Sequence, residues 1–184
     1  MKIHLETSRL ILRDWKESDL APFARLNADP VVMEHFPAPL NEEQSAAFVS
    51  RIRKHLSERG YGLYAVEEKE SAEFLGYVGM QDVTFEESFT PCIEVGWRLR
   101  KESWRRGYAT EAAKACLKQG FSQLNLPAIH SFTAFYNLPS QRVMQKIDLR
   151  PLGSFDHPKV PEGHHLRPHV LYGITKEEFQ QKEK

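Results

Sequence analysis

The sequence lacks an excess of charge of either sign, because its 184 residues include 25 basic and 25 acidic side chains. A net charge of zero gives no global field that would draw the chain to nucleic acid or to an anionic membrane. The chain also lacks the run of roughly 20 apolar residues needed to span a bilayer. The segment from Met1 to Glu6 has no apolar core of the kind found in signal peptides. We therefore expect a cytoplasmic protein that binds a small, locally charged ligand.

Cysteine is scarce, with Cys92 in a predicted strand and Cys116 on the apolar face of a predicted helix. In such places a thiol behaves as a small apolar side chain, so neither residue indicates a disulfide or a metal site. The histidines of the C-terminal region, His157, His164, His165 and His169, match no standard zinc-ligand spacing. We expect no metal. The sequence also lacks internal repeats and low-complexity segments, so we expect one domain over residues 1–184.

Apolar periodicity divides the chain into alternating strands and helices. The predicted elements are strands at 7–15, 63–68, 74–83, 92–99, 128–136, 149–155 and 169–174, and helices at about 18–29, 41–60, 109–124 and 140–147, followed by a charged tail at 176–184. Asn41 followed by Gln44 is a capping-box pattern, and Gly60 is a typical helix stop. The segments 31–40 and 157–168 are predicted loops. The first fits a substrate-facing lip or an ordinary loop with an apolar anchor.

The stretch from Trp104 to Ala112 is a basic, glycine-bearing turn between a predicted strand and a predicted helix. The unpaired N–H groups of a helix's first turn and the helix dipole together favour bound anions such as phosphate. Gly107 lets the backbone approach a ligand closely, and Arg105 and Arg106 supply positive charge. A tight turn without a ligand is the alternative interpretation.

Three motifs occur along the chain in a fixed order. They are Ser8-Arg9-Leu10-Ile11-Leu12-Arg13, Gly107-Tyr108-Ala109-Thr110-Glu111-Ala112 and Asn137-x-x-Ser140-x-x-Val143-Met144-x-Lys146. With the order of predicted elements, they resemble the GNAT superfamily of acetyl-CoA-dependent N-acetyltransferases, specifically its RimJ/RimL-like branch. This resemblance implies the GNAT fold. It is an α/β (α+β) domain with a mixed, mostly antiparallel central sheet flanked by helices and a splayed cofactor cleft between two central parallel strands.

The resemblance also implies which residues hold acetyl-CoA. The family's pyrophosphate-binding turn matches Arg105, Arg106, Gly107, Tyr108, Ala109 and Thr110. The strand ending at Leu99 matches the family strand that pairs with the pantetheine arm, so backbone groups of Trp97 and Leu99 are expected contacts. Ordinary pairing within a closed sheet is the alternative for that strand. Asn137 and Ser140 match residues near the cofactor arm, although both residue types also cap helices.

The chain departs from the family pattern at several positions. Trp104 replaces a frequent glutamine or arginine, and Arg105 replaces a common glycine, which would stiffen the turn. In many members a tyrosine is proposed to protonate the departing thiolate, and that position is Met144 here. Because methionine cannot donate a proton, Ser140, an ordered water or Tyr136 would have to substitute.

Glu94 is the candidate general base, and Ser140 is the second candidate catalytic residue. A neutral amine must attack the thioester, so some group must take its proton. Partial burial would raise the pKa of Glu94 into a useful range, whereas an exposed glutamate paired with Arg98 is the alternative. Deprotonation at pH 7 costs about 1 kcal/mol for a terminal amine but about 4 to 5 kcal/mol for lysine. A weakly basic acceptor is therefore favoured.

The resemblance implies an enzyme that transfers acetyl directly from acetyl-CoA to a primary amine, and the expected acceptor is the N-terminal α-amine of a protein or peptide. The expected partners are acetyl-CoA and this amine, without nucleic acid, membrane or metal, and a homodimer is compatible. A small-molecule amine is the alternative acceptor. A CoA-binding regulatory domain with weak catalysis is an alternative of another class, motivated by Met144.

Overall fold

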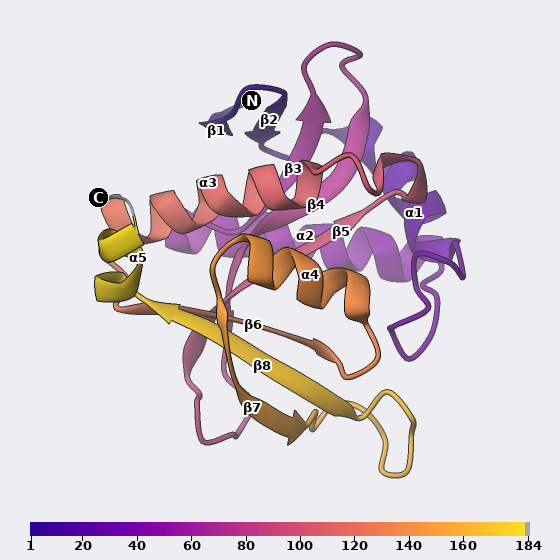
Figure 1. The fold of residues 1–184 in the computed structure, drawn as a ribbon. Helices are drawn as coiled ribbons and strands as arrows, with labels where there is room; N and C mark the ends of the chain where they lie inside the picture. The colour runs from indigo at the N-terminus through magenta and orange to yellow at the C-terminus, as the bar shows by residue number, and fades with distance from the viewer. Residues whose placement is uncertain (183–184) are drawn as a thin grey trace.

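The computed structural model describes residues 1–182, which fold around an eight-stranded sheet (Figure 1). The strands are β1 (Ile3–Glu6), β2 (Leu10–Arg13), β3 (Leu63–Glu68), β4 (Phe74–Val83), β5 (Cys92–Leu99), β6 (Ala128–Ala134), β7 (Arg150–Asp156) and β8 (Pro168–Thr175). The α-helices are α1 (Leu20–Ala28), α2 (Glu42–Arg59), α3 (Tyr108–Ser122), α4 (Leu138–Lys146) and α5 (Lys176–Lys182). No helix within these residues is long and apolar enough to cross a membrane.

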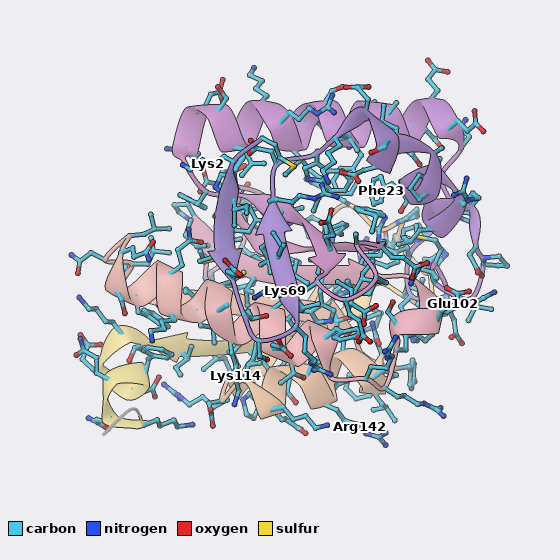
Figure 2. The ribbon with its side chains drawn as sticks, turned by 90° about the horizontal axis from the view of Figure 1, so that it is seen from above. Lys2, Phe23, Lys69, Glu102, Lys114 and Arg142 are labelled. Carbon is cyan, nitrogen blue, oxygen red and sulfur yellow. The ribbon has the colours of Figure 1, made fainter. Side chains whose placement is uncertain are left out.

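The strand order is β1-β2-β3-β4-β5-β6-β8-β7, and every neighbouring pair is antiparallel except β5 and β6. Helices α1 and α2 cover one face of the sheet, whereas α3 and α4 cover the other, as the view from above shows (Figure 2). The predicted fold class, a mixed and mostly antiparallel sheet flanked by helices, is confirmed.

Helix α3 lies close to the sheet because its packed face carries small residues. Ala112, Ala113 and Cys116 are completely buried, as the apolar periodicity predicts. At Gly120, an added Cβ would lie 2.6 Å from Cδ1 of Ile129 on β6, so a larger side chain would push the helix outward. This close packing fixes the position of α3 against β4, β5 and β6.

The capping box predicted for α2 is confirmed. The Asn41 side chain accepts a hydrogen bond from the Gln44 N–H at 2.8 Å, and the Gln44 side chain accepts one from the Asn41 N–H at 2.9 Å. Gly60 ends the helix with a φ of 74°, a left-handed conformation that favours glycine.

The N-terminal strand differs from the prediction. Residues 7–15 do not form one strand, because β2 starts at Leu10 and pairs with the additional strand β1 as a hairpin. A four-residue strand is too short for its alternation to stand out in the sequence. The hairpin turn is anchored to α3 by Glu111, which accepts hydrogen bonds from the Thr7 hydroxyl at 2.6 Å and from Arg9 Nε at 2.7 Å. This contact joins the first sequence motif to the second.

The other elements lie close to their predicted positions, and the charged tail forms α5 as far as Lys182. The last two residues of that predicted tail lie outside the described residues. Strands β4 and β5 pair at eight positions, but β5 and β6 pair only at Glu94 and His130. Beyond this point the two parallel strands separate, which confirms the splayed pair at the centre of the sheet.

Candidate active site

A cavity of about 1070 Å³ opens where β5 and β6 separate. Its walls come from these strands, the first turns of α3 and α4, the segment 31–37 and the loop between β7 and β8. Every residue that the sequence analysis assigned to cofactor binding or catalysis lines this cavity: Glu94, Trp97, Leu99, Arg105, Arg106, Gly107, Tyr108, Ala109, Thr110, Asn137 and Ser140. The fold therefore gathers residues that are far apart in the sequence around one space.

The turn before α3 has the geometry of an anion-binding site. Gly107 is the N-cap and has a φ of 81°, a left-handed conformation that glycine adopts without strain. The first N–H bonded to a helical carbonyl is that of Glu111, which donates to Gly107 at 3.0 Å. The N–H groups of Tyr108, Ala109 and Thr110 consequently have no acceptor within the helix. They and the positive end of the helix dipole favour a phosphate group here.

The two departures at the start of this turn fix its shape. Arg105 also has a left-handed backbone, with a φ of 61°, which costs a non-glycine residue roughly 1–2 kcal/mol. Trp104 donates a hydrogen bond from its indole Nε1 to the carbonyl oxygen of Leu99 at 2.8 Å and so ties the turn to the end of β5. The Leu99 carbonyl, an expected contact for the cofactor arm, is therefore already engaged within the protein.

Part of the positive charge of Arg106 is engaged within the protein. Its guanidinium lies 3.4 Å from Glu68, and Tyr108 also donates a hydrogen bond from its hydroxyl to Glu68. The Tyr108 ring is buried, with the guanidinium carbons of Arg9 and Arg106 at 4.6 and 4.9 Å from its centroid. The Tyr108 side chain thus links the turn to β3. Only its backbone N–H is then left to contact a ligand in the cavity.

Glu94 is buried, with 8% of its surface exposed, and lines the cavity. Burial raises its pKa to about 7, although the hydrogen bond from Gln81 Nε2 at 2.8 Å lowers it somewhat. This bond goes to Oε2, and Oε1 has no protein donor among residues 1–182. The structure contains no ion pair between Glu94 and Arg98, so the alternative of an exposed, paired glutamate is wrong. The predicted rise in the pKa of Glu94 is confirmed.

Asn137 caps α4, as its residue type predicts. Its side chain accepts from the Ser140 N–H at 3.2 Å and donates to the Thr133 hydroxyl at 2.8 Å, so both ends of the amide are engaged. The Ser140 hydroxyl makes no hydrogen bond to residues 1–182, and Ser140 and Met144 both line the cavity. Tyr136 is 69% exposed and is not among the lining residues, so the geometry favours Ser140 over Tyr136 as a proton donor.

Arg98 is a lining residue whose role the sequence analysis missed, because it considered only a pairing with Glu94. The residue is buried, with 8% of its surface exposed, and it donates from Nη1 to Asn27 Oδ1 at 2.6 Å. It also lies 4.0 Å from the centroid of Phe36. The sequence did place Arg98 on the same face of the strand as Glu94, and this could have indicated that Arg98 also lines the site.

Aromatic side chains form the wall of the cavity beside the loop between β7 and β8. Phe85, Phe132, His157 and His169 line it, and their rings pack against each other with Phe155 behind. Burial lowers the pKa of His157 to about 4 and also lowers that of His169, so both rings are neutral at pH 7. No group of three or more metal-ligating side chains is assembled within residues 1–182. Sequence spacing could not reveal this cluster, because it draws on three separate segments.

Both predicted loops, 31–40 and 157–168, contribute residues to the cavity wall. In the segment 31–40, Met33 is buried as the expected apolar anchor, and His35 and Phe36 line the cavity wall, while a substrate-facing role for the segment stays a prediction. In the loop between β7 and β8, Lys159 lines the wall beside His157.

Comparison with known proteins finds acetyltransferases that resemble this chain in sequence and in fold. A family model described as an acetyltransferase (GNAT) domain matches residues 9–150. The uncharacterized N-acetyltransferase YnaD of Bacillus subtilis is 29% identical over 178 residues, which cover 96% of this chain and 99% of YnaD. A solved GNAT-family acetyltransferase from Bacillus anthracis is 27% identical, covers 95% of this chain and 99% of that chain, and has a TM-score of 0.79.

A further solved structure holds coenzyme A. It is RimL, a ribosomal L7/L12 alpha-N-protein acetyltransferase, which is 16% identical, covers 95% of this chain and 98% of that chain, and has a TM-score of 0.76. At this identity the likeness shows a shared fold. The family match covers most of the chain, including the turn before α3 and the separating strands. The chain belongs to the GNAT acetyltransferase family.

Proposed function

We propose that this chain transfers the acetyl group of acetyl-CoA directly to a primary amine, and that the acceptor is the N-terminal α-amine of a peptide or protein. The observation that supports this most is the buried carboxylate of Glu94, with a pKa of about 7, on the cavity wall. Such a group is half ionised at neutral pH and is a competent base. An exposed glutamate, with a pKa near 4.3, is a much weaker one.

The cavity fits acetyl-CoA as the donor. The free N–H groups at the start of α3 suit its pyrophosphate, and Arg105 adds positive charge beside them. The edge of β5 beyond Glu94 has no partner strand on the β6 side, so the backbone around Trp97 can pair with the amide-bearing arm. Asn137 and Ser140 line the opposite wall.

In the proposed reaction, Glu94 acts as the base and Ser140 as the proton donor. Acetyl-CoA supplies the acetyl group as a thioester. Glu94 takes a proton from the acceptor ammonium group through Oε1, and the neutral nitrogen then bonds to the acyl carbon while the carbon–sulfur bond breaks. The Ser140 hydroxyl donates a proton to the departing thiolate and recovers one, through water, from the acylated nitrogen. The products are the N-acetylated amine, coenzyme A and the proton on Glu94, which is released to solvent.

The strength of the base favours an α-amine. A base with a pKa of about 7 matches a terminal amine of pKa near 8, which costs about 1 kcal/mol to deprotonate at pH 7. Lysine costs about 4 to 5 kcal/mol. Assignment to the RimJ/RimL-like branch is part of this proposal, and it is supported by the order of the three motifs and by the fold shared with RimL.

A small-molecule amine is the second candidate acceptor. It is favoured by the two segments, 31–37 and 157–169, that wall the cavity on the acceptor side. Walls on two sides suit a compact acceptor. A non-catalytic CoA-binding domain, the third candidate, gives no reason for a buried carboxylate of raised pKa in the cleft.

The experiment is acetyl-CoA turnover with a panel of peptides and amines, together with calorimetric titration of coenzyme A. Glu94→Gln should lower kcat/KM by about 10²- to 10⁴-fold, because the base is lost while the shape is kept. Wild-type kcat/KM should rise as the pH increases through about 7, since only ionised Glu94 accepts a proton. The coenzyme A Kd should stay the same.

Glu86→Gln is the matched control, because Glu86 is exposed on the β4–β5 loop and is not a lining residue. It should change neither rate nor affinity. Tight coenzyme A binding by wild type without turnover of any acceptor would refute the enzyme proposal. A pH–rate profile that is the same in wild type and Glu94→Gln would refute Glu94 as the base.

A further inference from the structure

Arg98 is a buried cation without a counter-ion. Only 8% of its surface is exposed, and no carboxylate among residues 1–182 lies within the 4.0 Å of an ion pair. The guanidinium makes one hydrogen bond, from Nη1 to Asn27 Oδ1 at 2.6 Å. Its Nε is buried without any acceptor. Unpaired buried charge is costly, so proteins normally neutralise a guanidinium in such a place.

The surroundings hold this guanidinium in one orientation. The Asn27 side chain donates to the Ser45 hydroxyl at 3.0 Å, which turns its oxygen toward Arg98. The rings of Phe36, Tyr77 and Phe48 lie 4.0, 5.6 and 5.7 Å from the guanidinium carbon. Aromatic faces support a guanidinium without using its N–H donors.

The N–H donors of Arg98 that remain unpaired lie along one edge of the guanidinium. With Nη1 engaged by Asn27, the Nε and Nη2 groups form an edge of the planar fork that no described residue uses. Two parallel N–H groups on such an edge match the two oxygens of a carboxylate. Arg98 lines the cavity while its Nε is enclosed by the protein, so a molecule within the cavity reaches this edge from the Nη2 side.

Arg98 belongs to the acceptor side of the cavity. Its contacts come from α1, α2, β4 and the segment 31–37, on the sheet face opposite α3 and its anion-binding turn (Figure 2). It shares the face of β5 with Glu94, four residues earlier, so their Cα atoms are roughly 13 Å apart along the strand. A negative and a positive group thus stand on one wall, each without an oppositely charged protein partner.

We propose that Arg98 is a specificity-determining residue that binds a carboxylate carried by the acceptor. The acceptor class is then a primary amine that also bears a carboxylate, either a free amino acid or a peptide with an acidic residue near its N-terminus. This inference rests on the proposed acetyl transfer and names its acceptor class. Polyamines, which bring further positive charge to a buried guanidinium, are poor acceptors.

The test compares acceptors in matched pairs that differ in the carboxylate. One arm uses amino acids of increasing amine-to-carboxylate distance, from glycine to 6-aminohexanoate, against their amides. The other arm uses peptides with Asp or Glu in the first two positions against the same peptides with Asn or Gln, and spermidine is the polycationic acceptor. The arm with the larger preference identifies the source of the carboxylate.

Wild type should prefer the carboxylate member by about ten- to hundredfold in kcat/KM, the range of a charge-assisted hydrogen-bonded contact. Arg98→Met should lose most of this preference and keep its coenzyme A Kd, and Arg98→Lys should keep part of it. Arg51→Met is the matched control, because Arg51 stacks on Phe48 from the exposed side at 5.4 Å and is not a lining residue. It should keep the full preference.

Equal kcat/KM for carboxylate and amide in wild type would overturn the inference, as would an equal loss for both in Arg98→Met. Binding supplies a readout that does not need turnover. Calorimetry with coenzyme A-saturated protein should show the carboxylate member binding about ten- to hundredfold more tightly to wild type, but not to Arg98→Met. Absence of turnover with this binding difference present would refute the proposed acetyl transfer and leave the carboxylate site standing.

Discussion

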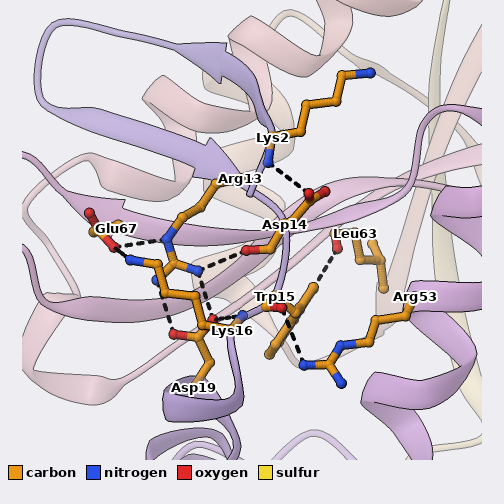
Figure 3. A network of polar contacts seen from close by, with 9 residues as sticks. All are labelled: Lys2, Arg13, Asp14, Trp15, Lys16, Asp19, Arg53, Leu63 and Glu67. Carbon is orange, nitrogen blue, oxygen red and sulfur yellow. Dashed lines mark hydrogen bonds and ion pairs between the residues drawn. The ribbon is translucent and has the colours of Figure 1, made fainter.

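Two regions of the molecule bury an arginine almost completely and treat its charge in opposite ways. On β2, Arg13 is 1% exposed and is surrounded by acceptors (Figure 3). Its guanidinium donates to both oxygens of Asp19, at 2.7 and 3.0 Å, and to Glu67 at 2.8 Å. On β5, Arg98 has a single amide oxygen as its partner. Both arginines are buried, but within residues 1–182 the charge of Arg13 is neutralised by carboxylates and that of Arg98 is not.

The paired charges around Arg13 stabilise the fold, whereas the unpaired charges on the cavity wall suit a ligand. The network of Arg13, Asp19, Glu67 and Lys16 is closed, because each charge meets its opposite within 3.0 Å. On the cavity wall, Glu94 and Arg98 leave their charges apart, which lowers the stability of the folded chain unless a ligand bridges them. Charge left unpaired in a cavity indicates where a ligand's own charges belong.

The two regions also shift carboxylate pKa values in opposite directions. Burial alone would raise the pKa of Glu67, but hydrogen bonds from Lys16 and Arg13 bring it below its usual value. Burial raises the pKa of Glu94 to about 7, and the Gln81 amide offsets this only in part. Glu67 is hydrogen-bonded to two cations, whereas Lys159 acts on Glu94 only through a weaker charge interaction, so burial decides the sign there.

The largest expected effect is on the closed network. Arg13→Met leaves Asp19 buried without its cation and Glu67 with Lys16 alone, so the free energy of unfolding should fall by about 3–5 kcal/mol. Urea denaturation at pH 7 measures this change. Arg53→Met is the matched control, because Arg53 is half-exposed and pairs with Glu17 at 2.8 Å, and it should cost at most about 1 kcal/mol. Equal losses in the two variants would contradict the distinction drawn between the two regions.

Local patterns were sufficient to predict much of the fold and part of the site. The alternation of β3, β4 and β5 and the capping box of α2 are encoded within a few residues, so their bounds follow from the sequence. The turn at Gly107 could be recognised for the same reason, because strand, glycine and helix start are contiguous. The hairpin partner β1 was missed because four residues carry little periodicity.

The surroundings of Arg98 could not be predicted in this way. Asn27, Phe36 and Tyr77 come from three elements that meet only in the folded sheet. Arg13 and Arg98 both occupy ordinary strand positions, so the sequence does not distinguish them. Tertiary packing decides that, among the described residues, Arg13 lies beside carboxylates and Arg98 does not. Partial burial of Glu94 was one of two interpretations that the sequence allowed, and its separation from Arg98 depends on Gln81 and Asn27, which engage the two side chains individually.

The second largest expected effect is the dependence of stability on pH that comes from Glu94. With a pKa of about 7 in the folded chain and near 4.3 when unfolded, Glu94 binds more protons in the folded state between these values. The free energy of unfolding therefore falls as the pH rises from about 4.3 to above 7, by a total on the order of 3 kcal/mol from Glu94. Glu94→Gln should match wild type near pH 4.5 and exceed its free energy of unfolding by that amount at pH 8.

Urea denaturation of both proteins from pH 4.5 to 8 measures this difference, and subtracting the two curves removes the contribution of the other titrating groups. Glu67→Gln sharpens the contrast, because the lowered pKa of Glu67 contributes stability above its unfolded value that is lost on acidification. This variant should be less stable than wild type at pH 8. A curve for Glu94→Gln parallel to that of wild type would mean that Glu94 is not a buried, unpaired carboxylate.

The smallest expected effect is the stability change of Arg98→Met. Methionine fills the space between the aromatic rings and removes the cost of a buried cation, but it leaves Asn27 Oδ1 without its donor. These terms oppose one another, so the free energy of unfolding should stay within about 1 kcal/mol of wild type. Measured beside Arg13→Met in the same urea titration, this near-neutral result would show that burial alone does not make an arginine structural. A loss as large as that of Arg13→Met would instead assign Arg98 to the scaffold.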